Sequence, residues 1–130
     1  MKRFFFVFLM IFMSFLFNTQ VFAGYVEDKI NEYVTKGDAL VLEKKYTEAL
    51  EEYKKASEMN REKSVPHYKM GVAYYFLNND EQAEICYKEA IKLDPSYSKA
   101  MNNLALVYEK MGRAKEALQL YSTQKTSPSS

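Results

Sequence analysis

Hydrophobic and polar residues are arranged in two different ways along the chain. Residues 4–17 are apolar except for Ser14. Beyond residue 30, apolar residues recur every three or four positions with charged residues between them, which is the pattern of amphipathic helices. One such face, with spacing i, i+3, i+4 and i+7, consists of Met70, Ala73, Tyr74 and Leu77. The pattern predicts an all-α fold after the apolar run.

Residues 1–23 have the layout of a secretory signal peptide. A short basic start, Met1-Lys2-Arg3, precedes the apolar run, and Val21-Phe22-Ala23 places small residues three and one before a cleavage point. We therefore expect a mature protein that begins at Gly24 and is exported. Its expected location is the periplasm or cell envelope, or the extracellular space.

The alternative for this segment is a retained membrane anchor. A spanning helix needs roughly 20 apolar residues, and the run of residues 4–17 is shorter than that. An anchor would have to extend through the polar residues 18–20 to reach Ala23. We expect contact with a membrane only if the segment is retained in this way.

The chain after residue 30 repeats at a constant interval, which is the signature of stacked structural repeats. It divides into units 30–63, 64–97 and an incomplete 98–130. The columns in phase are Gly37, Gly71 and Ala105, then Ala49, Ala83 and Ala117, then Tyr53, Tyr87 and Tyr121. Small residues in register allow two helices to approach closely, and tyrosine fills the space beside them. Each unit is therefore predicted to be a pair of helices.

Turn residues fall where the helix pairs need them. Asn78-Asn79-Asp80 separates the two predicted helices of the second unit and supplies an N-cap. Asp94-Pro95 closes that unit, because the residue before proline disfavours the helical region. Pro66 fits the first turn of a helix, where its missing N–H is not needed.

A helix–turn–helix unit of this length with these columns resembles the tetratricopeptide repeat family. The segment 91–97, Ile-Lys-Leu-Asp-Pro-Ser-Tyr, carries the resemblance most clearly, together with the bulky column Tyr33, His67 and Met101. The resemblance implies a short right-handed α-solenoid over residues 24–124. It also implies a protein–protein interaction module, an adaptor or scaffold, and no enzymatic activity.

In that family, peptides or helices of partner proteins lie in the concave groove formed by the first helices of the units. By resemblance, the groove residues here are Val34, Asp38, Tyr68, Val72, Tyr75, Asn102, Leu106 and Glu109. The neighbouring positions Val41, Leu42 and Phe76 belong to the same ligand-contacting set. Some members grip a terminal carboxylate with Lys, Asn and Arg at these positions, and only Asn102 resembles that clamp.

Charge and chemistry exclude several other functions. The 18 Lys and Arg nearly balance the 17 Asp and Glu, so no basic face for nucleic acid is indicated. One histidine, His67, and one cysteine, Cys86, leave too few groups for a catalytic dyad, a metal site or a disulfide framework. We expect no metal and no cofactor, with a protein as the partner.

The C-terminal end supports a second hypothesis. No polar capping helix fits after the third unit, so Leu118 and Leu120 are expected to be partly exposed. The Ser- and Thr-rich residues 125–130 are predicted to form a flexible tail. An uncapped repeat suggests a self-assembling structural protein, a homo-oligomer that stacks through this end. Cys86, expected to be half exposed, would then be available to pair with another chain.

Overall fold

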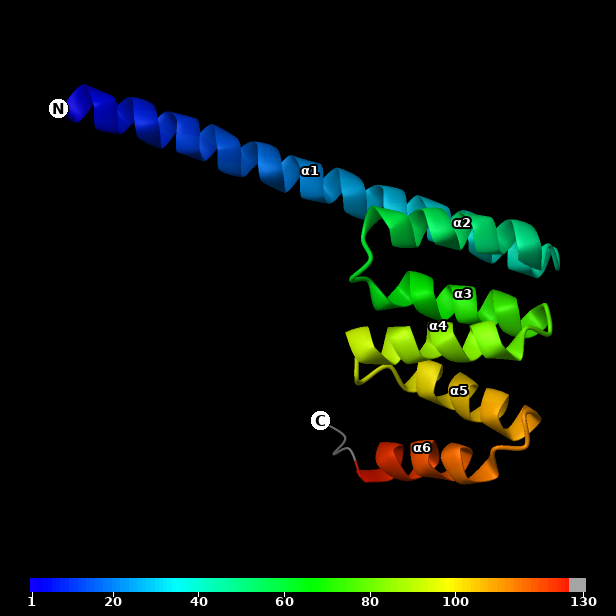
Figure 1. Ribbon diagram of the computed structural model, residues 1–130. Coiled ribbons are helices and arrows are strands. Elements are labelled where there is room, and N and C mark those ends of the chain that lie inside the picture. Colours follow the sequence, from blue (N-terminus) through cyan, green and yellow to red (C-terminus); the bar gives the residue numbers. More distant parts are fainter. Residues whose placement is uncertain (127–130) are drawn as a thin grey trace.

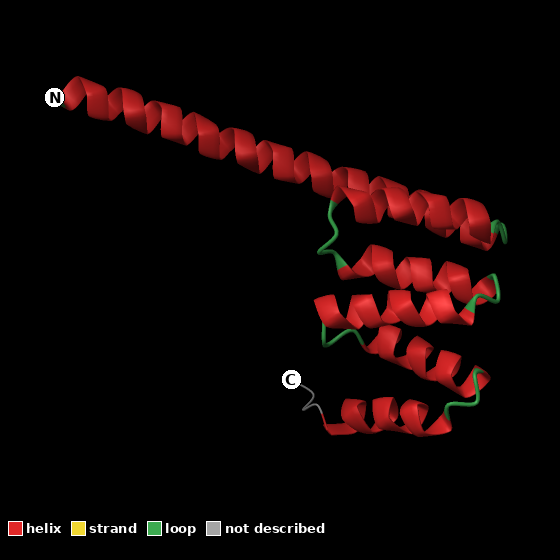
Figure 2. Cartoon of the chain, in the orientation of Figure 1, coloured by secondary structure: helices red, strands yellow, loops and turns green. Residues whose placement is uncertain are grey.

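The computed structural model describes residues 1–126, and these residues form helices joined by short turns (Figure 2). The helices are α1 (Lys2–Leu42), α2 (Tyr46–Met59), α3 (Ser64–Phe76), α4 (Asp80–Leu93), α5 (Ser98–Lys110) and α6 (Ala114–Thr126). The described part contains no strand. The all-α prediction is confirmed, and the helices pair as α1 with α2, α3 with α4, and α5 with α6.

The helices form a single stack in chain order (Figure 1). Contacts run mainly between neighbours, from α1 and α2 through to α5 and α6, as expected for a repeat protein in which each unit touches only the next. The first helices of the units also meet, since α3 contacts both α1 and α5. This row of first helices positions the candidate site.

The glycine and tyrosine columns pack against each other. A methyl group added at Gly37 would lie 2.4 Å from the ring of Tyr53, and one added at Gly71 would lie 2.6 Å from the ring of Tyr87. Both tyrosines are 1% exposed. In the third unit Ala105 already carries that methyl group, and Tyr121 is 36% exposed. In the first two units the ring therefore occupies the space that a side chain on the facing glycine would need.

The turn within each unit has the same geometry. Lys44, Asn78 and Gly112, which occupy the same position in successive units, have positive φ angles of 59°, 57° and 75°. The following amide donates to a carbonyl five residues earlier, as in Lys45 to Leu40 at 2.9 Å and Asn79 to Tyr74 at 2.9 Å. This is the Schellman closure of a helix, for which glycine is the least strained residue and lysine the most unusual of the three.

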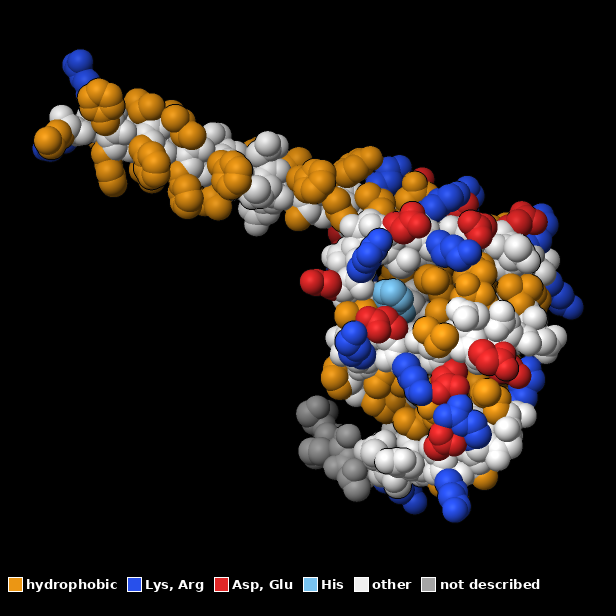
Figure 3. All heavy atoms as spheres, in the orientation of Figure 1, with side chains coloured by type: hydrophobic (Ala, Val, Ile, Leu, Met, Phe, Trp, Pro, Cys, Tyr) orange, Lys and Arg blue, Asp and Glu red, His pale blue; other side chains and the backbone are white. Residues whose placement is uncertain are grey.

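The first helix is much longer than a repeat needs. Its N-terminal half projects beyond the stack, with hydrophobic side chains exposed along it (Figure 3). By length and hydropathy α1 could cross a membrane, a test that signal peptides also pass. The helix continues through Gly24 without a break, so the expected boundary after residue 23 is not marked by a change of backbone conformation.

At the other end, α6 includes Lys125 and Thr126, the first two residues of the expected tail. The remainder of that tail, residues 127–130, lies outside the described residues. Of the two leucines expected to be partly exposed, Leu118 is 66% exposed and Leu120 is partly buried.

The prediction that Cys86 is half exposed is wrong. The side chain is 6% exposed, and burial raises the pKa of the thiol to about 11. Glu52, at the same position of the first unit, is also 6% exposed and lies 2.7 Å from Lys55. This column faces the interior of the stack because α4 is covered on both sides, and a buried, protonated thiol is not available to another chain.

Candidate functional site

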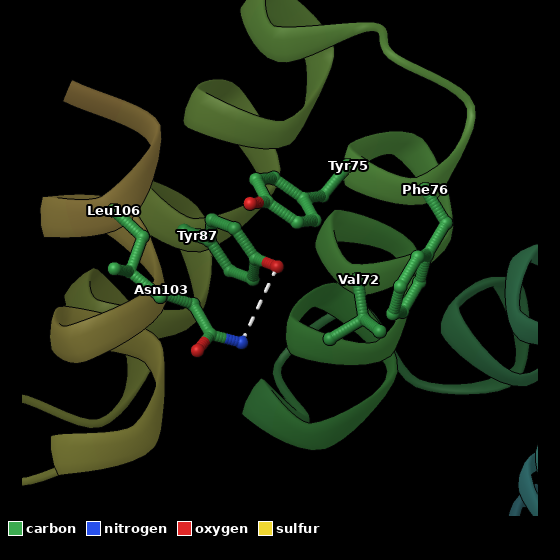
Figure 4. Close-up of a pocket in the computed structure, with 6 residues that line it drawn as sticks. All are labelled: Val72, Tyr75, Phe76, Tyr87, Asn103 and Leu106. Carbon is green, nitrogen blue, oxygen red and sulfur yellow. Dashed lines mark hydrogen bonds between the residues drawn. The ribbon is translucent and has the colours of Figure 1, made fainter. Parts of the chain in front are cut away.

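A pocket of about 140 Å³ opens between α3 and α5. It is lined by Val72, Tyr75, Phe76, Tyr87, Asn103 and Leu106. Figure 4 shows α3 residues on one side and α5 residues on the other, with the Tyr87 ring between them. These side chains lie next to one another because α3 and α5 are equivalent helices of successive units and turn the same face to the same side of the stack. A cavity of about 150 Å³ accommodates a benzene-sized group, so the pocket suits one apolar side chain.

A second hollow of about 320 Å³ lies between α1 and α3. Its lining consists of Asp38, Val41, Leu42, Tyr53, Tyr68, Lys69 and Val72. Val72 borders both hollows, so together they form one groove across the first helices of the three units. We call this surface the groove.

The two charged side chains that line the groove, Asp38 and Lys69, neutralise each other. The Asp38 carboxylate accepts hydrogen bonds from the Tyr53 hydroxyl at 2.6 Å and from the Lys69 ammonium at 2.8 Å. Burial, and next the hydrogen bond to Asp38, raise the pKa of Tyr53, so its hydroxyl remains a donor at neutral pH. This end of the groove therefore offers polar groups without a net charge.

Asn103 fixes the hydroxyls at the centre of the groove. Its side-chain amide donates to the hydroxyls of Tyr68 and Tyr87, both at 3.4 Å, and the second bond is drawn in Figure 4. The Tyr68 ring also packs edge-on against Tyr97, at 5.0 Å between centroids. Burial raises the pKa of Tyr87. The centre of the groove is thus lined by the rings of Tyr68 and Tyr87, whose hydroxyl groups accept hydrogen bonds from Asn103.

An aromatic ridge borders the apolar pocket. Phe76, 47% exposed, stacks on Tyr46 at 4.8 Å and meets the edge of Tyr75 at 5.8 Å. The Lys110 ammonium lies 5.0 Å from the Tyr75 ring centre and 2.8 Å from Asp80. Tyr75 is therefore held from two sides, and its ring is presented to the pocket in a fixed orientation.

The structure brings together five of the eight expected groove residues. Asp38, Tyr68, Val72, Tyr75 and Leu106 line the two hollows. The other three, Val34, Asn102 and Glu109, are not among the lining residues of either hollow.

Sequence reasoning missed Lys69 and Asn103, which occupy the same position of their units, one residue after Tyr68 and Asn102. Their polar character on an otherwise apolar helix face was the available signal. It also missed Tyr53 and Tyr87, whose rings belong to the core while their outer parts reach the groove.

His67 is half buried, and its Nε2 lies 3.1 Å from the Arg61 carbonyl oxygen. This contact ties the start of α3 to the preceding turn, so His67 has a structural role.

Family models of the tetratricopeptide repeat match three stretches of the chain. The stretches are residues 37–78 ("TPR repeat"), 65–97 ("Tetratricopeptide repeat") and 86–119 ("Tetratricopeptide repeat"). Together they run over most of the region in which the structure shows paired helices. The chain belongs to the tetratricopeptide repeat family. It contains about three repeats.

Known proteins resemble this tetratricopeptide repeat chain in sequence and in fold. It is 32% identical over 74 residues to the Photosystem I assembly protein Ycf3 of Synechococcus sp. (strain CC9605), an alignment that covers 55% of this chain and 43% of that protein. The chain thus matches less than half the length of this relative.

Two solved structures are similar over a greater length. The second repeat domain of Spaghetti (RPAP3), bound to the HSP90 peptide SRMEEVD, has a TM-score of 0.70 and 27% identity, covering 73% of this chain and 88% of that one. The second repeat domain of human RPAP3, in complex with the HSP70 peptide SGPTIEEVD, has a TM-score of 0.71 and 26% identity, covering 75% and 82%. Both domains bind peptides of other proteins, which supports a protein–protein interaction module.

Proposed function

We propose that this protein binds a peptide or helix of a partner protein in the groove and acts as an adaptor or scaffold without catalysis. The observation that carries the proposal is the apolar pocket between α3 and α5, flanked by the Asp38–Lys69 ion pair and by the Asn103 amide. An apolar pocket with a few fixed polar groups at its edge is the usual form of a peptide-recognition site.

The chemistry of the groove favours an internal segment with a large apolar side chain as the ligand. Leu106 is 46% exposed and Phe76 is 47% exposed, so both offer apolar area that a ligand would cover. The Asp38 carboxylate at the other end is already paired with Lys69. A terminal carboxylate would meet a lysine whose charge Asp38 already compensates, so it would gain little at this end of the groove.

The test uses peptides selected from a random library against the immobilised full chain. Tyr75→Ala and Leu106→Glu should each weaken binding of a selected peptide by about tenfold or more, because each removes part of the apolar pocket. Binding is measured by fluorescence anisotropy with a labelled peptide.

Ile85→Glu is the matched control. Ile85 is 57% exposed on α4 and lines neither hollow, so the same kind of substitution there should leave peptide affinity unchanged. Circular dichroism of each variant establishes that the helices are intact. Unchanged affinity in both groove variants, with intact helices, would contradict the proposal.

We further propose that residues 1–23 direct export, which places the repeats in the cell envelope or outside the cell. The support is the order of the basic start, the apolar run and the small residues at 21 and 23. The exposure of the whole apolar segment in the structure is consistent with a segment whose partner is not the repeat domain itself.

A further inference from the structure

The outer face of α6 carries side chains that the internal helices bury. Leu118 is 66% exposed, whereas Leu50, which has the same position in the first unit, is 5% exposed. Tyr121 is 36% exposed, whereas Tyr53 is 1% exposed. Leu50 is covered because α3 packs on α2. The outer face of α6 therefore carries the same kinds of apolar side chain that α2 buries against the next unit.

Junctions inside the chain follow a positional rule, counted from the first residue of each unit. Position 17 of one unit meets position 13 of the next. At the first junction these residues are Tyr46 and Phe76, whose rings stack at 4.8 Å. At the second they are Asp80 and Lys110, which form an ion pair at 2.8 Å. The partners match in chemistry at both junctions.

Two further positions complete the rule. Position 21 of one unit shares a buried cluster with position 10 of the next, as Leu50 and Ala73 show. Position 28 packs on the cluster that contains position 3 of the next unit, as Ile91 and Ala100 show. The order of the pairs, 17 with 13, 21 with 10 and 28 with 3, is that of two antiparallel helices.

The two ends of the chain satisfy the same rule. On α6, positions 17, 21 and 28 are Ala114, Leu118 and Lys125. On α1, positions 13, 10 and 3 are Leu42, Ala39 and Glu32. All six side chains are exposed, and Leu42 is 85% exposed. The resulting pairs are apolar with apolar, apolar with apolar, and basic with acidic.

We propose that α6 of one copy packs antiparallel on α1 of a second copy, so that the repeats continue from chain to chain. The charges favour this arrangement over two copies of α6 facing each other. Lys115 and Lys125 flank Leu118 on α6, while Glu32 of α1 and Glu43, the residue that follows α1, flank Ala39. Both spacings are about 15 Å along a helix. Glu32 and Glu43 already have local partners in Lys29 and Lys45, and α6 would add bases opposite them.

A head-to-tail contact of this kind uses two different surfaces, so it adds further copies in a row unless the rotation between copies closes a ring. The first helices of the copies would then form one row, and the groove would continue from one chain into the next. Longer segments of a partner protein would be bound by the assembly than by one chain.

The experiment is sedimentation of the full chain in a density-matched non-ionic detergent. The mass of the wild-type protein should rise with concentration. Leu118→Glu blocks the α6 face and Ala39→Arg blocks the α1 face, so each variant alone should remain one chain per particle. Because each keeps the face that the other lacks, an equimolar mixture should form a one-to-one dimer. Ile85→Glu, exposed on α4 away from both faces, should behave as the wild type.

Three results would overturn the proposal. The wild type could stay a single chain at every concentration. Ala39→Arg could still associate while Leu118→Glu does not, which would indicate pairing of two α6 helices. Both blocked variants could associate like the wild type, which would indicate association through the apolar N-terminal segment. Helix content by circular dichroism shows that each variant is folded before its mass is interpreted.

Discussion

At the scale of single residues, the absence of a side chain decides how closely the helices of a unit approach. Gly37 and Gly71 face tyrosine rings at distances where a methyl group has no room. In the third unit Ala105 takes this position, and the equivalent Tyr121 lies on α6, which contacts only α5 among the described helices, and is 36% exposed. The close approach of helix and ring is therefore established for the first two units.

Gly71→Ala should lower the stability of the repeats. The new methyl group would lie 2.6 Å from the Tyr87 ring, and overpacking of this kind costs about 1–3 kcal/mol. Alanine also has a higher helix propensity than glycine, which stabilises the folded state by about 1 kcal/mol. The expected net loss is about 1 kcal/mol, measured by urea denaturation followed by circular dichroism.

Gly24→Ala provides the comparison for this substitution. No atom lies within 4 Å of the methyl group it would add, and Gly24 is also inside a helix. It should not reduce stability. A Gly71→Ala protein as stable as the wild type would show that the ring can move away without cost.

At the scale of helices, ion pairs fix the junction between the second and third units. The Glu84 carboxylate lies 2.5 Å from Lys88 on its own helix and 2.6 Å from Arg113, in the turn before α6. Burial alone would raise the pKa of Glu84, but the hydrogen bonds from Lys88 and Arg113 outweigh it, and the pKa is lowered. Glu84 therefore contributes to folding in its ionised form.

The stability that Glu84 contributes should depend on pH. A carboxylate with a lowered folded-state pKa stabilises fully above its unfolded pKa, near 4.5, and loses this contribution as the pH falls through the folded value. Glu84→Gln should cost about 1 kcal/mol at neutral pH. The difference from the wild type should shrink below about pH 4.5, measured by urea denaturation at a series of pH values.

Glu81→Gln is the control for that measurement, because Glu81 is exposed on the same helix. It should change stability little at any pH, as surface charges usually do. A Glu84→Gln difference that stays constant from neutral to acidic pH would argue against an ionic role for Glu84.

At the scale of the whole molecule, a long apolar helix and a stack of repeats share one continuous element. The segment before Gly24 is exposed on α1, while the segment after it begins to contact α2 and α3. Two environments therefore meet within a single helix. Whether the two parts stay connected depends on processing after synthesis.

Export with cleavage predicts a mature chain that begins at Gly24. Residues 21–23 carry the cleavage pattern, so N-terminal sequencing of the protein isolated from its producing cells should start with Gly-Tyr-Val. A protein that still begins at Met1 and is found in the membrane fraction would instead support the retained anchor.

Much of the architecture follows from the repeat alone. The columns containing Gly37, Tyr53 and Ala49 predict the helix pairs, their turns and the contacts within a unit. These contacts join residues of adjacent helices in one unit, so a hairpin of two helices with a fixed turn determines them. For the same reason the repeat predicts that the first helices of the units lie next to one another, as the contacts of α3 with α1 and α5 show.

Contacts between units depended on the tertiary structure. The sequence does not state the angle at which one helix pair meets the next, and this angle buries Cys86 and Glu52. It also turns Lys69 towards Asp38 and Asn103 towards Tyr87. The sequence by itself determined what each repeat unit is, because its contacts are local. Only the packing of unit on unit decided which side chains line the groove and which faces remain open at the ends.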